Sequence, residues 1–168
     1  MGRDWTGPTV FRYIDWLITV PLQIVEFYLI LAAITIVPAA LFWRLLIYSL
    51  VMLVFGYLGE AGFMNVTFGF VIGMAGWLLI LYEIFAGEAS KINADSANAS
   101  CQKAFNALRL IVTIGWAIYP IGYVFGYLLE SSNINAVNII YNYADLINKT
   151  AFGLVIWAAA IKDSEASA

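Results

Sequence analysis

The sequence predicts an all-α integral membrane protein, with five transmembrane helices in one domain that comprises residues 1–168. Of these 168 residues, 63% are hydrophobic and 11% are charged, and the mean hydropathy is +0.87, which is far too apolar for a soluble domain of this length. Five apolar stretches come close to the roughly 20 residues that a helix needs to cross the hydrocarbon core. No stretch of about ten residues alternates between polar and apolar side chains, so membrane strands are not expected.

Each predicted span ends at a recognisable break in the sequence. The spans are 10–33, 41–58, 66–85, 105–129 and 136–161. Pro38 interrupts the chain after the first span, Gly59-Glu60-Ala61-Gly62 ends the second, and Glu130-Ser131-Ser132-Asn133 separates the last two. The one long linker, 87–103, is rich in Ala, Ser and Asn, and we expect a solvated loop there.

Basic residues near the span ends predict the orientation. The side that follows odd-numbered spans carries Arg44, Lys91, Lys103, Arg109 and Lys162, whereas the opposite side has only Arg3. Because cytoplasmic ends are enriched in Lys and Arg, we expect the N-terminus outside and the C-terminus in the cytoplasm. Residues 1–9 contain no apolar core of a signal peptide, so no cleavable signal peptide is expected.

Charge and cysteine usage exclude several classes of function. The net charge of −3 gives no basic surface for nucleic acid. Cys101 is the only cysteine, which rules out an internal disulfide. With one thiol and no histidine, a metal site built by the protein is not expected.

Lys149 is the most informative residue, because it is a lone ammonium within the apolar stretch 136–161. Asp145 lies one helical turn before it. Such a lysine is costly in a membrane unless it is paired or chemically neutralised. A buried Asp–Lys bridge between helices is one explanation, but desolvation of both charges offsets their attraction. A desolvated lysine amine also readily forms a Schiff base with an aldehyde, which would give the residue a function.

The first span carries a polar stripe formed by Arg12, Asp15, Thr19 and Glu26. At about 100° per residue these side chains project in closely related directions, and Asp15 and Glu26 are roughly 16 Å apart along the helix. Taken alone, Arg12 could snorkel at a span end and Thr19 could bond back to a carbonyl beside Pro21. Two carboxylates and an arginine on one face of an apolar helix favour a functional path.

Aromatic residues lie deep in the spans rather than only near the membrane interfaces, where Trp and Tyr usually collect. They are Trp16, Trp77, Trp116, Tyr119 and Tyr123. Trp116, Tyr119, Pro120 and Tyr123 share one helical face. Spaced aromatics most often serve packing, but together with a lysine they are compatible with a flat conjugated ligand.

Four segments of the chain carry a family resemblance: Arg12-Tyr13-Ile14-Asp15-Trp16-Leu17-Ile18-Thr19-Val20-Pro21-Leu22, Gly59-Glu60-Ala61-Gly62, Gly115-Trp116-Ala117-Ile118-Tyr119-Pro120 and Ala144-Asp145-Leu146-Ile147-Asn148-Lys149. They resemble the proteorhodopsins, a family of microbial rhodopsins that are light-driven proton pumps with all-trans retinal. They are distributed over the whole chain. The resemblance implies a multi-pass protein of a bacterial inner membrane, whose partners are the lipid bilayer, retinal, protons and, commonly in this family, further copies of the chain.

The resemblance also assigns a role to each charged site residue. Lys149 would carry retinal as a Schiff base, Asp15 would accept the Schiff-base proton, and Glu26 would return a proton from the cytoplasmic side. Asp145 would be the second counterion, and Arg12 would tune the acceptor and the outward path. Asp15, Thr19 and Glu26 match the triplet that marks proton pumps in this family.

The retinal pocket implied by the resemblance consists of nine residues from four spans. They are Trp16, Thr19, Gln23, Met52, Gly56, Trp77, Trp116, Tyr119 and Pro120. Gln23 predicts the colour, since the family has leucine there in green-absorbing forms and glutamine in blue-absorbing forms. We therefore expect blue absorption.

The chain differs from the family pattern in two respects. Family members have seven helices, and the five predicted here resemble the last five, so the first two are expected to be absent. The family places a histidine beside the proton acceptor, and this chain has none. Two alternatives to a pump remain at this point: a sensory photoreceptor that signals to a partner, and an incomplete fragment that does not respond to light.

Overall fold

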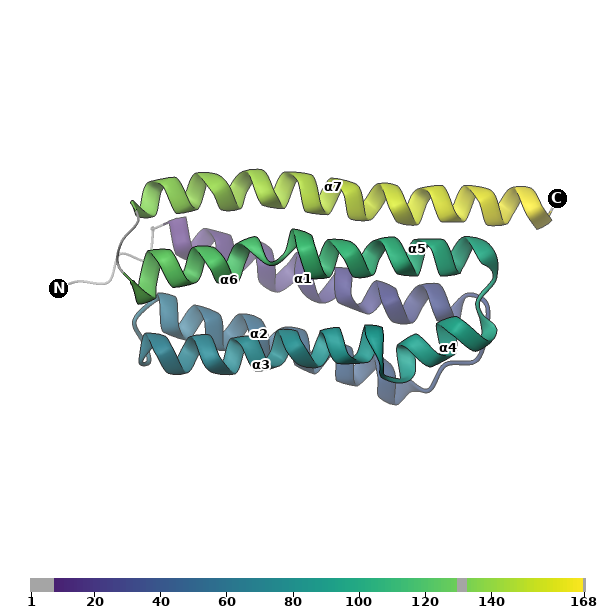
Figure 1. Ribbon diagram of the computed structural model, residues 1–168, viewed down its shortest axis with the longest axis horizontal. Helices are drawn as coiled ribbons and strands as arrows, with labels where there is room; N and C mark the ends of the chain where they lie inside the picture. The colour runs from purple at the N-terminus through teal and green to yellow at the C-terminus, as the bar shows by residue number, and fades with distance from the viewer. Residues whose placement is uncertain (1–7, 130–132, 168) are drawn as a thin grey trace.

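The computed structural model describes residues 8–129 and 133–167, and these residues form helices and short connections without strands. The elements are α1 (Pro8–Ala32), α2 (Ala39–Glu60), α3 (Val66–Phe85), α4 (Glu88–Ser96), α5 (Ala99–Leu110), η1 (Ile111–Gly115), α6 (Ile118–Tyr123), η2 (Val124–Leu128) and α7 (Ile134–Ser167). Figure 1 shows the long helices aligned along one axis, with α7 along one edge of the bundle and α2 and α3 along the opposite edge.

Five helical stretches within the described ranges are long and apolar enough to cross a membrane, which confirms the predicted all-helical fold with five apolar spans. They are Pro8–Ala32, Ala39–Glu60, Val66–Ser96, Ala99–Leu128 and Ile134–Glu165. Two features predicted from the sequence, the basic residue Arg3 and the turn at 130–132, lie outside the described residues.

The expected solvated loop at 87–103 is wrong for most of its length. Instead, α4 occupies Glu88–Ser96 and α5 begins at Ala99. The segment has low hydropathy, but Ala, Glu and Lys are good helix formers, so polarity alone did not indicate a loop. Asn98 caps α5 by accepting a hydrogen bond from the backbone N–H of Cys101 at 2.9 Å. Arg44 on α2 anchors α4 through an ion pair with Glu88 at 2.5 Å.

The α2 and α3 helices pack closely because glycines lie at their contact. A Cβ atom at Gly69 would lie 2.8 Å from the Cα of Gly59, and one at Gly76 would lie 2.8 Å from the backbone nitrogen of Met52. In a membrane, where the hydrophobic effect does not drive helices together, such small residues permit the van der Waals contact that stabilises a helix pair. This pair forms one wall of the cavity described below.

The fourth span is irregular, in contrast to the single helix predicted at 105–129. It starts at Ala99 and contains two π-helical segments, η1 and η2, on either side of α6. In η1 the backbone N–H of Trp116 bonds to the carbonyl of Ile111 at 3.0 Å, five residues back. Pro120 has no N–H to offer, so regular helical bonding is interrupted here. π-helical segments often occur at functional sites.

Candidate functional site

Lys149 lies where α1 and α7 meet, beside two carboxylates. Its Nζ forms an ion pair with Asp15 on α1 and lies 3.6 Å from a carboxylate oxygen of Asp145 on α7. The Lys149 side chain is 26% exposed, that of Asp15 is 47% exposed and that of Asp145 is 17% exposed. The structure therefore brings together the three residues that the last and first spans indicated.

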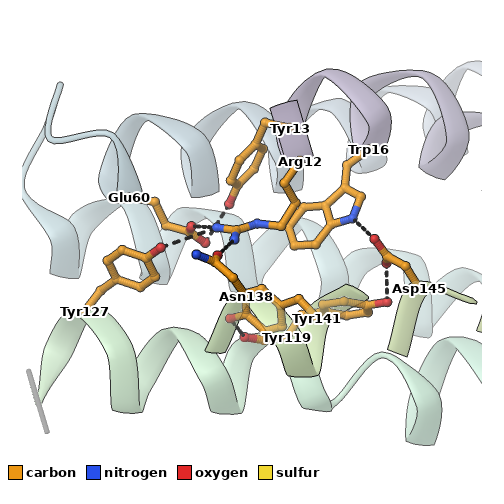
Figure 2. A network of polar contacts seen from close by, with 9 residues as sticks. All are labelled: Arg12, Tyr13, Trp16, Glu60, Tyr119, Tyr127, Asn138, Tyr141 and Asp145. Atoms are coloured by element: carbon orange, nitrogen blue, oxygen red, sulfur yellow. Dashed lines mark hydrogen bonds and ion pairs between the residues drawn. The ribbon is translucent and has the colours of Figure 1, made fainter. Parts of the chain in front are cut away.

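Asp145 is held by hydrogen bonds from two other spans, as Figure 2 shows. The indole Nε1 of Trp16 donates to one carboxylate oxygen at 2.8 Å, and the hydroxyl of Tyr119 donates to the other at 2.6 Å. Hydrogen bonds to a carboxylate are stronger than those between neutral groups, so both oxygens are kept in place. Trp16 and Tyr119, predicted only as pocket residues, thus also orient the carboxylate beside Lys149.

Arg12 is bound to Glu60 at the end of α2, although the sequence grouped it with Asp15. Its guanidinium forms an ion pair with Glu60 and donates a hydrogen bond to the side-chain oxygen of Asn138 on α7. The hydroxyl of Tyr13 donates to the second oxygen of Glu60 at 2.9 Å. The side chains of Arg12 and Glu60 are both buried. Two opposite charges are therefore enclosed between α1, α2 and α7.

The buried arginine cluster is continuous with the lysine site. The guanidinium carbon of Arg12 lies 4.8 Å from the ring centre of Tyr141 and 5.2 Å from that of Trp16. Both distances are typical of cation–π contacts. Trp16 in turn donates to Asp145, so packed groups extend from Glu60 to Asp145 (Figure 2), whose carboxylate lies beside Lys149.

Several residues of this network were not identified as site residues from the sequence. They are Tyr13, Glu60, Tyr127, Asn138, Tyr141 and Asn148. Glu60 was interpreted as part of the turn that ends the second span and of one segment of the family resemblance, without a role at the site. Its partner Arg12 lies 48 positions away in the sequence, so no local pattern links the two. The one signal that could have suggested this pair is the presence of a carboxylate, Glu60, at the end of one apolar span and of an arginine, Arg12, within another, because charges in a membrane need partners.

A cavity between the helices includes Lys149 and is lined mainly by apolar and aromatic side chains. Eight of the nine predicted pocket residues line it: Trp16, Gln23, Met52, Gly56, Trp77, Trp116, Tyr119 and Pro120. The Nε1 of Trp77 is fixed by a hydrogen bond to the carbonyl of Val112 at 3.0 Å. A mostly apolar cavity with a few polar groups at defined places is typical of a small-molecule site.

Thr19 does not line this cavity. Its hydroxyl donates to the backbone carbonyl of Asp15 at 3.0 Å, which is the backbone bonding considered from the sequence. Together with Gln23, Glu26 and Lys149, Thr19 lines a second cleft between α1 and α7. The structure thus places Glu26 in a cleft that also reaches Lys149. The interval from Arg12 to Glu26 corresponds to about four turns of α1.

The sequence profile of bacteriorhodopsin-like proteins matches residues 5–163, which is most of the chain. The chain belongs to this family. The charged groups around Lys149 and the aromatic cavity are therefore those of a bacteriorhodopsin-like protein.

The chain is similar to two curated proteorhodopsins and to one in a solved structure. It is 55% identical to the blue-light absorbing proteorhodopsin of Gamma-proteobacterium Hot 75m4 over 94% of this chain and 63% of the relative. It is 54% identical to the green-light absorbing proteorhodopsin of Gamma-proteobacterium EBAC31A08, over 94% of this chain and 64% of the relative. The crystal structure of blue light-absorbing proteorhodopsin from Med12 is 60% identical, with a TM-score of 0.77 over 93% of this chain and 68% of that one.

These matches correct one expectation. The family match extends over residues 5–163 and the relatives align with 94% of the chain, so we withdraw the expectation that the chain lacks the first two of seven helices. The chain spans 63% and 64% of the length of the two curated relatives.

Proposed function

We propose that this protein is a light-driven outward proton pump that carries all-trans retinal on Lys149 and absorbs blue light. The observation that carries the proposal is the position of the Lys149 ammonium, beside the carboxylates of Asp15 and Asp145 and on the wall of an aromatic cavity. In this proposal the protein is a transporter and not an enzyme. Its similarity to light-absorbing proteorhodopsins supports the same function.

The residues present are suitable for retinal. Rings of Trp16, Trp77, Trp116 and Tyr119 line the cavity and offer flat apolar surfaces to a conjugated chain. Lys149 is the one amine among the lining residues, so the linkage would form there. Bound as a Schiff base, retinal would supply light absorption, and the transferable proton would be the one on the linked Lys149 nitrogen.

Asp15 is the proton acceptor in this proposal. Its carboxylate pairs with Lys149, so a proton that leaves the lysine nitrogen has an acceptor in direct contact. A carboxylate oxygen of Asp145 lies 3.6 Å from the same nitrogen, but this carboxylate also accepts hydrogen bonds from Trp16 and Tyr119. Because two donors already stabilise its negative charge, we assign Asp145 the role of a fixed counterion.

Glu26 is the proton donor on the opposite side of the lysine. It shares a cleft with Lys149, Gln23 and Thr19. No hydrogen bond or ion pair of its carboxyl group is found among the described residues. A carboxyl group without a cationic partner in an apolar span is better able to hold a proton than one beside a cation, so Glu26 is suited to give a proton back.

The proposed orientation is N-terminus outside and C-terminus in the cytoplasm of a bacterial inner membrane. The basic segments that predict it lie near one another, since Arg44 pairs with Glu88 of α4, and Asn98 before α5 donates to Asp163 of α7 at 2.6 Å. Arg12 and Glu60 then lie toward the outer side, and Glu26 toward the inner side.

The proposed blue absorption rests on Gln23, which lines the cavity, because the blue- and green-absorbing relatives are almost equally similar to the chain.

Light-driven pH change in vesicles tests the proposed function. The chain is reconstituted with all-trans retinal, illuminated with blue light and compared with Asp15→Asn and with a protonophore control. We expect a pH change that follows the light and is absent in both controls. A pigment that gives no pH change would instead favour the sensory photoreceptor, and a preparation that forms no pigment would favour a fragment that does not respond to light.

A further inference from the structure

The irregular middle of the fourth span leaves the backbone carbonyl of Gly115 without its regular helical partner. The N–H of Tyr119 bonds to the carbonyl of Trp116 at 3.1 Å, three residues back, instead of to Gly115. The π-helical bond from Trp116 to Ile111 shifts the bonding pattern before this point. Carbonyls released in this way inside a membrane need partners from other elements.

Two side chains of α7 donate hydrogen bonds to carbonyls of this stretch, one of them that of Gly115. The side-chain amide of Asn148 donates to the carbonyl of Gly115 at 2.9 Å, and the hydroxyl of Tyr141 donates to the carbonyl of Tyr119 at 2.7 Å. Residues 141 and 148 are seven apart, and hence on one face of α7. We call these two hydrogen bonds the α7 clamp.

Asn148 connects the clamp to the site chemistry. It is buried and directly precedes Lys149 in α7. Its amide also lies 3.5 Å from the hydroxyl of Tyr119, which itself donates to Asp145. A Cβ atom at Gly115 would lie 3.0 Å from the Cγ of Asn148, so only glycine leaves the amide enough room.

We infer that Asn148 is a positioning residue, which fixes the Lys149-bearing turn of α7 against the cavity wall at Gly115–Tyr119. The amide ties one carbonyl of that wall to the turn that holds the lysine, so the spacing between Lys149 and the ring of Trp116 is set by this contact. The inference rests on the proposed function only where Lys149 carries retinal. The clamp itself is a property of the protein without retinal.

The first test therefore uses the retinal-free chain in detergent micelles. Asn148→Leu keeps the side-chain volume but removes the donor, and Asn142→Leu on the exposed face of α7 is the matched control. We expect Asn148→Leu to speed amide hydrogen exchange at residues 116–119 by up to about tenfold, because one buried hydrogen bond is lost locally. Exchange elsewhere in α5 and α7, and throughout the Asn142→Leu variant, should stay unchanged.

Gly115→Ala provides a second variant should Asn148→Leu fail to fold, since it displaces the amide from the opposite side. Both variants should also shift the absorption maximum of the retinal-bound chain, whereas Asn142→Leu should not. Unchanged local exchange, or an equal acceleration over the whole bundle, would overturn the inference, the latter by showing a merely structural role. If the unmodified chain forms no pigment, the proposed function fails, and the exchange data alone decide the inference.

Discussion

Neutralising Glu60 should destabilise the protein strongly, because it would leave the charge of Arg12 buried without its counterion. The two side chains are 2% and 5% exposed, and they are tied to α7 through Asn138. Removing one partner of a buried ion pair typically costs about 3–5 kcal/mol in the free energy of unfolding. Glu60→Gln retains the shape and an oxygen for the Tyr13 hydroxyl, so we expect about 3 kcal/mol for this variant, the lower end of that range.

The Arg44–Glu88 pair provides a control within the same protein. Its side chains are 34% and 37% exposed, and pairs as accessible as this contribute about 0–1 kcal/mol. Unfolding of the wild type, Glu60→Gln and Glu88→Gln is followed by circular dichroism during titration with a denaturing detergent. The double variant Arg12→Met/Glu60→Met should recover most of the lost stability, since no charge then remains buried. A loss for Glu60→Gln no larger than that for Glu88→Gln would refute the reasoning.

Three further predictions concern packing, proton return and colour. Gly76→Ala should cost about 1–3 kcal/mol in unfolding free energy, because its Cβ would lie 2.8 Å from backbone atoms of α2. The control Gly153→Ala, whose Cβ would meet nothing within 4 Å, should leave the unfolding free energy unchanged. Equal effects of the two variants in the same titration would contradict the packing account. Glu26→Gln should leave the absorption maximum almost unchanged and slow proton return by about 10²-fold or more in flash photolysis, and an unaltered rate would exclude Glu26 as the donor. Gln23→Leu should move the absorption band of the retinal-bound chain toward green, and an unmoved band would remove Gln23 as the colour determinant.

The sequence predicted the spans and the lysine site because both leave local signals. An apolar run of sufficient length is a helix in lipid regardless of its partners. The i,i+4 spacing of Asp145 and Lys149 placed these residues on one face, and the structure adds the ion pair with Asp15. The segment at 88–96 was mispredicted because a polar composition is compatible with either a loop or a solvated helix, and the contact of Arg44 with Glu88 was not visible in it.

The remaining site features depend on contacts between distant segments. The helical period placed Arg12 and Asp15 in similar directions, but it could not indicate that the arginine pairs with Glu60 on another helix. The clamp by Asn148 was missed for a related reason, since its acceptor is a backbone carbonyl that a π-helical turn releases. Propensity and periodicity carry little information about such a turn, which forms only in its tertiary setting.

The most direct test of the account is the absorption spectrum of this 168-residue chain after addition of all-trans retinal, with Lys149→Ala as the control. Asp15 is 47% exposed at the α1–α7 face, so the spectrum also reports whether the described helices enclose the site sufficiently to hold the ligand. We predict a band in the blue region that is lost in Lys149→Ala. Absorbance of free retinal only, or the same band in the Lys149→Ala variant, would contradict a retinal linkage at Lys149 in this chain.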